Sequence, residues 1–208
     1  DKIIHVVVED MPQKIEYQHH IDNFHRGCIL RGLKDAASND LILVSDLDEI
    51  PDSRLINLEM NTPSVFSHSN FGYALNIKVE SPFEMAHWLG TVALRYTDLE
   101  DMSLQEYRES RKIIAQTNLI EGGWHYSYVS DAQTILHKLQ SFSHTEILEQ
   151  NPNLTEELIQ HCIDNNFDFL GWFRYPPMGI QYKKYTLEDV NPPRYVLENQ
   201  HKFGHLIR

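Results

Sequence analysis

A short apolar stretch that ends in three acidic residues constrains this chain most. Residues Leu41–Val44 are all apolar, a pattern typical of a buried strand. The acids Asp46, Asp48 and Glu49 follow at once, and Pro51 prevents the strand from continuing. Carboxylates at the end of a buried strand are costly unless a cation lies beside them. The stretch therefore predicts a cation-binding site.

The spacing of the two aspartates favours a divalent metal. Asp46 and Asp48 are two residues apart, so in a regular strand both side chains would point to one face. Two hard oxygen ligands suit Mg²⁺ or Mn²⁺, and these ions in turn suit a diphosphate. The alternative is an acidic turn in solvent, which a bare Asp-x-Asp pattern forms more often. The strand before the motif and the Glu-Ile-Pro after it favour the metal site.

The elements before this strand predict an α/β fold. Residues Ile3–Val8 form a nearly continuous β-branched run, typical of a strand covered on both faces. Apolar residues then recur at helical spacing from Tyr17 to Ala37. Strand, helix and strand in this order are by default a parallel pair joined by a right-handed crossover. Ligands bind at the carboxyl ends of such strands, where the acids lie.

The rest of the chain predicts further strands and helices of a single domain, residues 1–208. Aromatic and β-branched residues between positions 64 and 97 predict strands. Asp131 is expected to cap a helix that runs to Phe142. We find no linker, internal repeat or low-complexity segment that would divide the chain.

Charge and composition argue against two classes of partner. The net charge of −12 over 208 residues, without a basic run, argues against nucleic acid. No apolar run approaches the length of a membrane span. An acidic protein that handles a phosphorylated ligand needs a metal or a local cluster of Arg and Lys. Arg111 could belong to such a cluster, although a surface salt bridge is the commoner use.

A second group of chemically useful residues follows two glycines. Trp124 could form a floor for a sugar ring, because the C–H faces of sugars pack on aromatic rings. His125 could bind a metal, contact phosphate or act as a general acid or base. Ser127 follows two residues later in the same Gly-flanked loop. The alternative is a hydrogen-bonded structural histidine beside a core tryptophan.

A third group lies along and after the helix that Asp131 is expected to cap. His144 could complete a metal site begun by the two aspartates. Alternatively, Lys138 is a solvated side chain, and His144 is a helix C-terminal residue favoured by the helix dipole.

Together these motifs resemble glycosyltransferase family 17. The resemblance covers nearly the whole chain, and the best-known member of the family adds the bisecting GlcNAc to N-glycans. The matching segments are residues 43–51, 122–128 and 138–146, with a similar ending over 175–199. The resemblance implies a GT-A-like, Rossmann-related mixed sheet flanked by helices. It also implies a metal-dependent inverting transfer, with GlcNAc from UDP-GlcNAc passing to a glycan hydroxyl.

The resemblance also implies roles for individual residues. Asp46 and Asp48 match the family's DxD motif and would hold Mn²⁺ or Mg²⁺ on the donor diphosphate, so that the leaving UDP is stabilised. Both His125 and His144 match the family, and either could be the third ligand. Trp124, Ser127 and Lys138 lie in the matching segments and are expected to bind donor or acceptor; Arg111 is expected to do so for its charge alone.

An inverting transfer also needs a base that deprotonates the acceptor hydroxyl. The candidates are Glu49, Asp131 and His125. Family members carry a strand–helix–strand unit before the strand that opens this chain, so the resemblance implies an N-terminally truncated fold. Two alternatives follow. One is a non-catalytic relative that binds glycans or nucleotide sugars, and the other is a phosphatase of the haloacid dehalogenase type with Asp46 as nucleophile.

Overall fold

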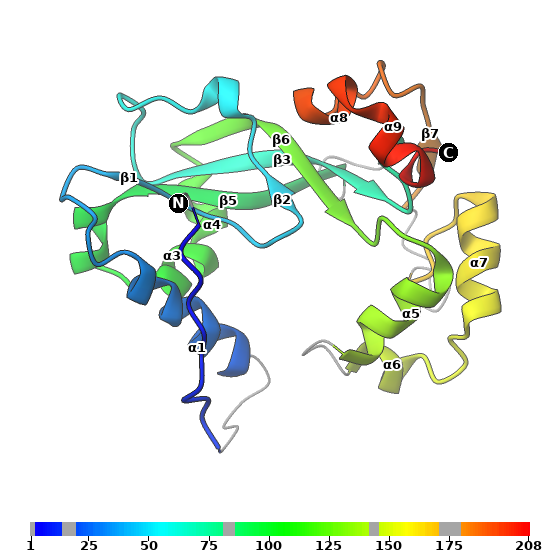
Figure 1. Ribbon diagram of the computed structural model, residues 1–208, viewed down its shortest axis with the longest axis horizontal. Coiled ribbons are helices and arrows are strands. Elements are labelled where there is room, and N and C mark those ends of the chain that lie inside the picture. The colour runs from blue at the N-terminus through cyan, green and yellow to red at the C-terminus, as the bar shows by residue number, and fades with distance from the viewer. Residues whose placement is uncertain (1–2, 14–19, 81–85, 142–145, 171–179) are drawn as a thin grey trace.

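A curled, mixed β-sheet flanked by helices organises the computed structural model, which describes residues 3–13, 20–80, 86–141, 146–170 and 180–208 (Figure 1). The predicted α/β class is therefore confirmed. The strands are β1 Leu41–Val44, β2 Glu49–Ile50, β3 Ser64–Gly72, β4 Ile77–Val79, β5 His87–Arg95, β6 Leu119–Ser127 and β7 Tyr182–Lys184.

The sheet is built around β3, which has neighbours on both sides. One path runs β1-β5-β3-β4-β7, and β6 pairs with β3 and with β2. The β3–β6 pair is parallel, and the other pairs are antiparallel. Although β3 is mostly buried, its sequence carries polar residues from Ser67 to Asn70.

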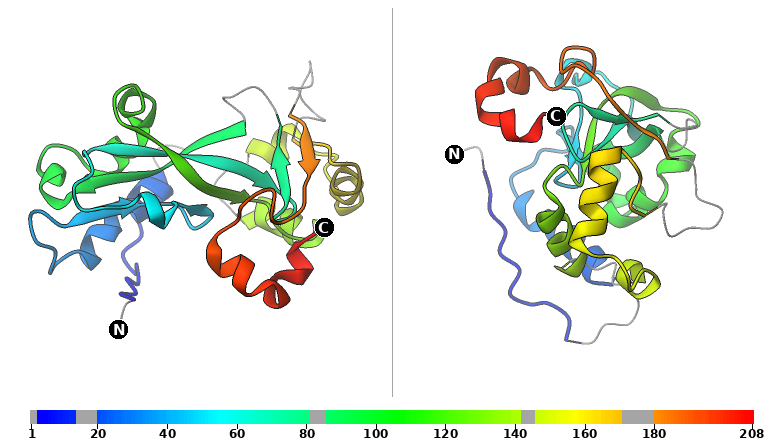
Figure 2. Two further views of the ribbon diagram at one scale, coloured as in Figure 1. Left: turned by 90° about the horizontal axis from the view of Figure 1, so that it is seen from above. Right: turned by 90° about the vertical axis from the view of Figure 1, so that its right-hand side faces the viewer.

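The helices gather at the two ends of the sheet (Figures 1 and 2). Near β1 lie α1 His20–Cys28, η1 Ile29–Gly32, η3 Tyr96–Glu100, α3 Leu104–Glu109 and α4 Arg111–Ile114. Toward the other end lie α5 Ala132–Ser141, α6 Glu146–Gln150, α7 Glu156–Asn165, α8 Arg194–Glu198, α9 Gln200–Phe203 and η5 Gly204–Leu206. The short turn η2 Ser53–Leu55 follows β2. No helix in the described ranges is long and apolar enough to span a bilayer.

Apolar side chains form separate clusters beneath these groups of helices. Val44, Val65 and Val92 of the sheet pack with Leu104 and Tyr107 of α3. The second cluster joins α5 and α7 to the residues after β3, and the third holds the C-terminal helices. The sheet is thereby supported at both ends, which leaves the acidic loop after β1 between them.

The predicted strand over Ile3–Val8 is wrong. Among the described residues this segment has no strand partner, and Ile3 is 84% exposed. The segment lies against η1 instead, where Arg31 donates two hydrogen bonds of 2.7 Å to Asp10. The predicted parallel crossover from Ile3–Val8 to Leu41–Val44 is therefore also wrong. Instead, β1 pairs antiparallel with β5. A β-branched run favours an extended backbone, but a strand needs a free sheet edge beside it.

Three other local predictions, for a helix, a helix cap and a loop, had different outcomes. The predicted helix over 17–37 is α-helical only from His20 to Cys28 and continues as the turn η1, while residues 17–19 lie outside the described ranges. The cap at Asp131 is confirmed, since its Oδ1 accepts the N–H of Thr134 at 2.7 Å. The glycine-flanked segment predicted as a loop is part of β6.

Candidate functional site

The acidic loop, residues 45–48, leads from β1 to β2 and so connects two separate parts of the sheet. In β2, Glu49 lies opposite His125 of β6. The loop is held at its end by Tyr126, whose N–H donates to the carbonyl of Asp48 at 2.9 Å. Strand pairing therefore places the acidic motif beside the histidine of the second motif.

Glu49 is a buried carboxylate saturated with hydrogen bonds. Arg108 of α3 donates to both of its oxygens at 2.8 Å, and Trp88 Nε1 donates to Oε1 at 2.7 Å. The N–H of Asp46 donates to Oε2 at 3.0 Å. Burial alone would raise the pKa of Glu49, but the hydrogen bonds and charge of Arg108 lower it to about 2. Such a carboxylate is a weak base with its lone pairs already engaged.

Asp46 lies between two guanidinium groups. Arg108 Nη2 contacts Oδ2 at 2.6 Å, and Arg26 Nη2 of α1 contacts Oδ1 at 3.0 Å. Arg26 also donates to Gln105 of α3. The side chain of Asp46 nevertheless remains 45% exposed. Asp46 therefore presents a carboxylate to solvent while two arginines hold its orientation.

Asp48 faces the opposite side of the loop, toward β6 and α5. Its Oδ1 lies 3.7 Å from His125 Nε2, and its Oδ2 lies 3.4 Å from Lys138 Nζ. The Lys138 ammonium also lies 4.8 Å from the ring centroid of Tyr128, within cation–π range. Asp48 is thus bracketed by an imidazole and an ammonium group.

The imidazole of His125 is oriented from two directions. Its Nδ1 lies 3.0 Å from Asn70 Oδ1 of β3, and an amide oxygen can only accept, so Nδ1 carries the hydrogen. The ring stacks on Trp88, with centroids 4.6 Å apart and planes 15° apart. Burial lowers the pKa of His125, although the nearby Asp48 opposes this effect. Nε2 of the neutral ring is therefore a bare acceptor that faces Asp48.

Arg111 of α4 is a partly buried cation that shares its nearest described carboxylate, Glu49, with Arg108. It donates to the carbonyls of Arg108 and Leu89 at 2.6 Å, and it packs 5.5 Å from the ring centroid of Trp88. The nearest carboxylate oxygen in its ion-pair contacts, from Glu49, is 3.9 Å away. Burial, followed by repulsion from Arg108, lowers the pKa of Arg111 to about 10.

The charges around the loop favour an anionic ligand. Cationic side chains outnumber carboxylates here, in a chain whose net charge is −12. The cations are Arg26, Arg108, Arg111 and Lys138, against Asp46, Asp48 and Glu49. A local surplus of positive charge in an acidic protein attracts anions. It disfavours a metal cation unless an anion binds together with it.

His68 of β3 lies in a slot beneath the site. The ring is fully buried, and neither nitrogen has a hydrogen-bond partner among the residues that the structure describes. Glycines on both neighbouring strands make room for it, because a Cβ at Gly90 would lie 2.6 Å from His68 Nδ1 and one at Gly123 would lie 2.7 Å from Cδ2. Burial lowers the pKa of His68 to about 4, so the ring is neutral at neutral pH.

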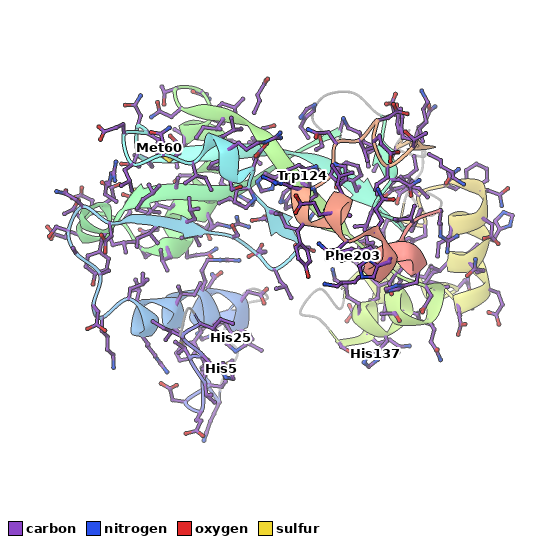
Figure 3. The ribbon with its side chains drawn as sticks, turned by 45° about the horizontal axis from the view of Figure 1, so that its top comes forward. His5, His25, Met60, Trp124, His137 and Phe203 are labelled. Atoms are coloured by element: carbon purple, nitrogen blue, oxygen red, sulfur yellow. The ribbon has the colours of Figure 1, made fainter. Side chains whose placement is uncertain are left out.

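Other residues predicted for the site have different surroundings. Trp124 is buried, and its Nε1 donates to the carbonyl of Asn191 at 3.0 Å, so it lies against the segment that leads into α8 (Figure 3). Ser127 follows His125 by two positions on β6 and therefore shares its face. Asp131 is exposed and caps α5. Neither Ser127 nor Asp131 contacts the acidic loop through any described hydrogen bond or ion pair.

The structure brings together part of the predicted metal site. His144 lies outside the described residues. Within the described ranges, no three His, Cys, Asp or Glu side chains converge tightly enough to hold an ion by themselves. The nearest approach to a ligand set is Asp48 with His125. A Mg²⁺ or Mn²⁺ ion suits such an open set, since it takes further ligands from water and phosphate.

Sequence reasoning did not single out the residues that orient this site. Arg26, Asn70, Trp88 and Arg108 belong to none of the motifs. One signal was present. The polar run from Ser67 to Asn70 interrupts a strand that is otherwise apolar and buried, and buried polar residues mark a site more often than exposed ones.

Fold and site together define an α/β protein with an acidic loop in a cationic setting, suited to a phosphorylated ligand. The sequence model of glycosyltransferase family 17 matches residues 1–208, and the chain belongs to this family. It is accordingly a glycosyltransferase, an enzyme that uses a sugar donor and an acceptor. Comparisons with curated proteins and with solved structures found no significant match.

Proposed function

We propose that the chain is a metal-dependent inverting glycosyltransferase that transfers GlcNAc from UDP-GlcNAc to a glycan hydroxyl. The observation that carries the proposal is the pairing of Asp48 with the bare Nε2 of His125. A metal-binding histidine usually donates its other ring N–H to a fixed acceptor, and Asn70 is such an acceptor here.

The residues present fit Mn²⁺ or Mg²⁺. Asp48 and His125 would hold the ion, and Asp46, the first aspartate of the motif, is a further candidate ligand from the sequence. Bound there, the metal would neutralise charge that develops on the leaving diphosphate. His144 remains a further candidate ligand from the sequence.

The surplus cations would bind the donor phosphates. Arg111 shares Glu49 with Arg108, and Lys138 lies at the open side of Asp48. Both were candidates for donor binding on sequence grounds. A guanidinium and an ammonium placed around an acidic loop complement a diphosphate whose other oxygens contact a metal.

The catalytic base is a separate question. The low pKa and four donors of Glu49 argue against proton abstraction by this residue. Asp131 is engaged as a helix cap, and the hydrogen bond from the backbone of Thr134 lowers its pKa. Assigned to the metal, His125 is also a poor candidate. The geometry therefore favours a base from another part of the site.

The phosphatase alternative fits less well. A nucleophilic Asp46 needs a carboxylate oxygen free to attack phosphorus, whereas both of its oxygens lie on arginines. The non-catalytic alternative predicts UDP-sugar binding without transfer. Turnover therefore distinguishes it from our proposal.

Calorimetry with UDP in the presence and absence of Mn²⁺ tests the metal role. We expect UDP binding to strengthen with Mn²⁺ in the wild type and to lose that dependence in Asp48→Asn and His125→Gln. Glu156→Gln on α7 removes an exposed carboxylate far from the loop in sequence and serves as the control. UDP binding that ignores Mn²⁺ in the wild type would refute the metal role.

A transfer assay with UDP-GlcNAc and a panel of N-glycan acceptors tests the reaction. Inversion requires a β-linked product from the α-linked donor, which NMR of the anomeric proton reports. An α-linked product, or donor binding without any transfer, would contradict the proposed reaction.

A further inference from the structure

The ion pair between Arg108 and Glu49 is the most completely buried charged group of the site. The exposed fractions of the two side chains are 4% and 1%. Besides its two bonds to Glu49, Arg108 donates to Asp46 Oδ2 at 2.6 Å and to the carbonyl of Gly90 at 2.7 Å. Both partners are therefore satisfied without water.

Such a pair contributes little to folding stability in itself. Removing two charges from water costs about as much as their attraction returns, and apolar side chains of similar volume often serve the fold equally well. Removing only one partner is a different matter, since it leaves a buried charge uncompensated. The presence of the pair therefore calls for an explanation other than stability.

Three hydrogen bonds of the pair point directly at the site. Arg108 binds the Asp46 carboxylate, while Glu49 accepts the Asp46 N–H and the Trp88 indole N–H. Trp88 in turn stacks on His125. One buried pair thus contacts the first aspartate of the motif and, through one ring, the imidazole beside the second.

The space that Glu49 occupies depends on a glycine. A Cβ at Gly90 would lie 3.1 Å from Glu49 Cδ and 2.6 Å from His68 Nδ1, closer than side chains normally approach. The same Gly90 offers its carbonyl to Arg108. The strand β5 therefore accommodates the pair through both the missing side chain and the backbone of one residue.

We infer that Arg108 and Glu49 are positioning residues that fix Asp46 and, through Trp88, His125 in the orientation required for donor binding and turnover. This inference rests on the proposed function for the identity of the ligand. It assigns the pair no contact with the donor or the acceptor. Groups that hold metal-binding residues in place typically change metal affinity or activity about 10- to 100-fold when they are replaced.

The double variant Glu49→Leu/Arg108→Met separates positioning from stability. It replaces both charges by apolar side chains and leaves no unpaired charge, so we expect cooperative urea unfolding, with a midpoint lowered by the N–H and carbonyl groups that lose a partner. We expect kcat to fall about 10- to 100-fold, while KM for the acceptor changes less than about threefold. Wild-type kcat in the folded double variant would overturn the inference.

An exposed ion pair provides the matched control. On α8, Arg194 Nε lies 2.7 Å from Glu198 Oε1, and the two side chains are 89% and 55% exposed. The variant Arg194→Met/Glu198→Leu makes the same chemical change without touching the site. We expect unchanged kcat, KM and urea midpoint for this control.

A single variant covers the case in which the double variant does not fold. Arg108→Lys keeps the charge but loses the two-pronged contact with Glu49. We expect faster hydrogen exchange of the Trp88 indole N–H, observed by ¹⁵N NMR and assigned with Trp88→Phe. An unchanged exchange rate in Arg108→Lys would overturn the inference.

The indole readout needs no ligand, so it also separates the two proposals. Absence of Mn²⁺-dependent UDP binding by the wild type would refute the proposed metal role. The coupling of Arg108 to Trp88 would still be decided by the exchange rate.

Discussion

His68 provides a quantitative test of burial in the centre of the sheet. Its pKa is about 4 in the folded protein, against 6.5 for an unperturbed histidine. Between these values the unfolded chain binds a proton at His68 that the folded chain does not. The folded state is therefore destabilised as the pH falls through this range. At neutral pH the effect on the free energy of unfolding is small, because the ring is mostly neutral in both states.

The size of the effect follows from the two pKa values. Integrating proton uptake between pH 7.5 and 4.5 gives a loss of about 2.5 kcal/mol in the free energy of unfolding from this residue alone. Glu49 stays ionised over the same range because its pKa is about 2. The charge of the neighbouring ion pair therefore does not change while His68 is being titrated.

His68→Phe removes the titrating group and keeps a planar ring in the slot. We expect the free energy of unfolding of the wild type, relative to the variant, to fall by about 2.5 kcal/mol from pH 7.5 to 4.5. Urea unfolding followed by circular dichroism at several pH values measures this difference. A constant packing penalty in the variant cancels, because only the pH dependence is compared.

The exposed His205 provides the control, as His205→Phe removes a histidine outside the core. We expect its pH dependence to follow the wild type. Parallel curves for the wild type and His68→Phe would refute the reasoning, since they would mean that His68 is protonated to the same extent in both states.

Three further substitutions test other parts of the structure. Gly123→Ala places a Cβ 2.5 Å from the carbonyl oxygen of Ile50, at a backbone φ of +113°. We expect the free energy of unfolding, measured with urea, to fall by at least about 2 kcal/mol. Wild-type stability of this variant would contradict the β2–β6 pairing. Asn70→Ala removes the acceptor for His125 Nδ1. Calorimetry should therefore detect about 10- to 100-fold weaker Mn²⁺ affinity. An unchanged affinity would argue against His125 as a metal ligand. Thr155→Ala removes the N-cap of α7 and should lower the free energy of unfolding by about 1 kcal/mol without changing kcat, which thermal unfolding and the transfer assay measure together.

The sequence predicted the residues at the centre of the site better than those around them. Acids at the end of an apolar strand and a histidine after two glycines are local signals, and β2–β6 pairing brings these two motifs together. Lys138, expected to bind donor or acceptor, lies 3.4 Å from Asp48 Oδ2, a contact that the sequence analysis did not predict. The two motifs meet because strand ends bring short segments together at one edge of a sheet.

The failed predictions depended on partners that a local pattern does not specify. Ile3–Val8 has every property of a buried strand except a sheet edge beside it. The sequence left open whether Trp124 is a sugar platform or a core residue, and its burial comes from the distant segment around Asn191. In both cases the decisive contact comes from residues distant in the sequence, which neither periodicity nor spacing encodes.

The same reasoning explains why the orienting residues escaped notice and where further ones should be sought. Arg108 is an ordinary helical arginine by sequence, and it becomes part of the site only because α3 packs on β1 and β5. Arg108 acts on Asp46 both directly, through its hydrogen bond to Oδ2, and through Glu49, which accepts the Asp46 N–H. We therefore expect kcat to fall more when a residue hydrogen-bonded to Glu49 is replaced than when a residue close to the acidic loop in sequence is replaced. Leu47, fully exposed between the two aspartates, should tolerate replacement better than Trp88, which lies on another strand.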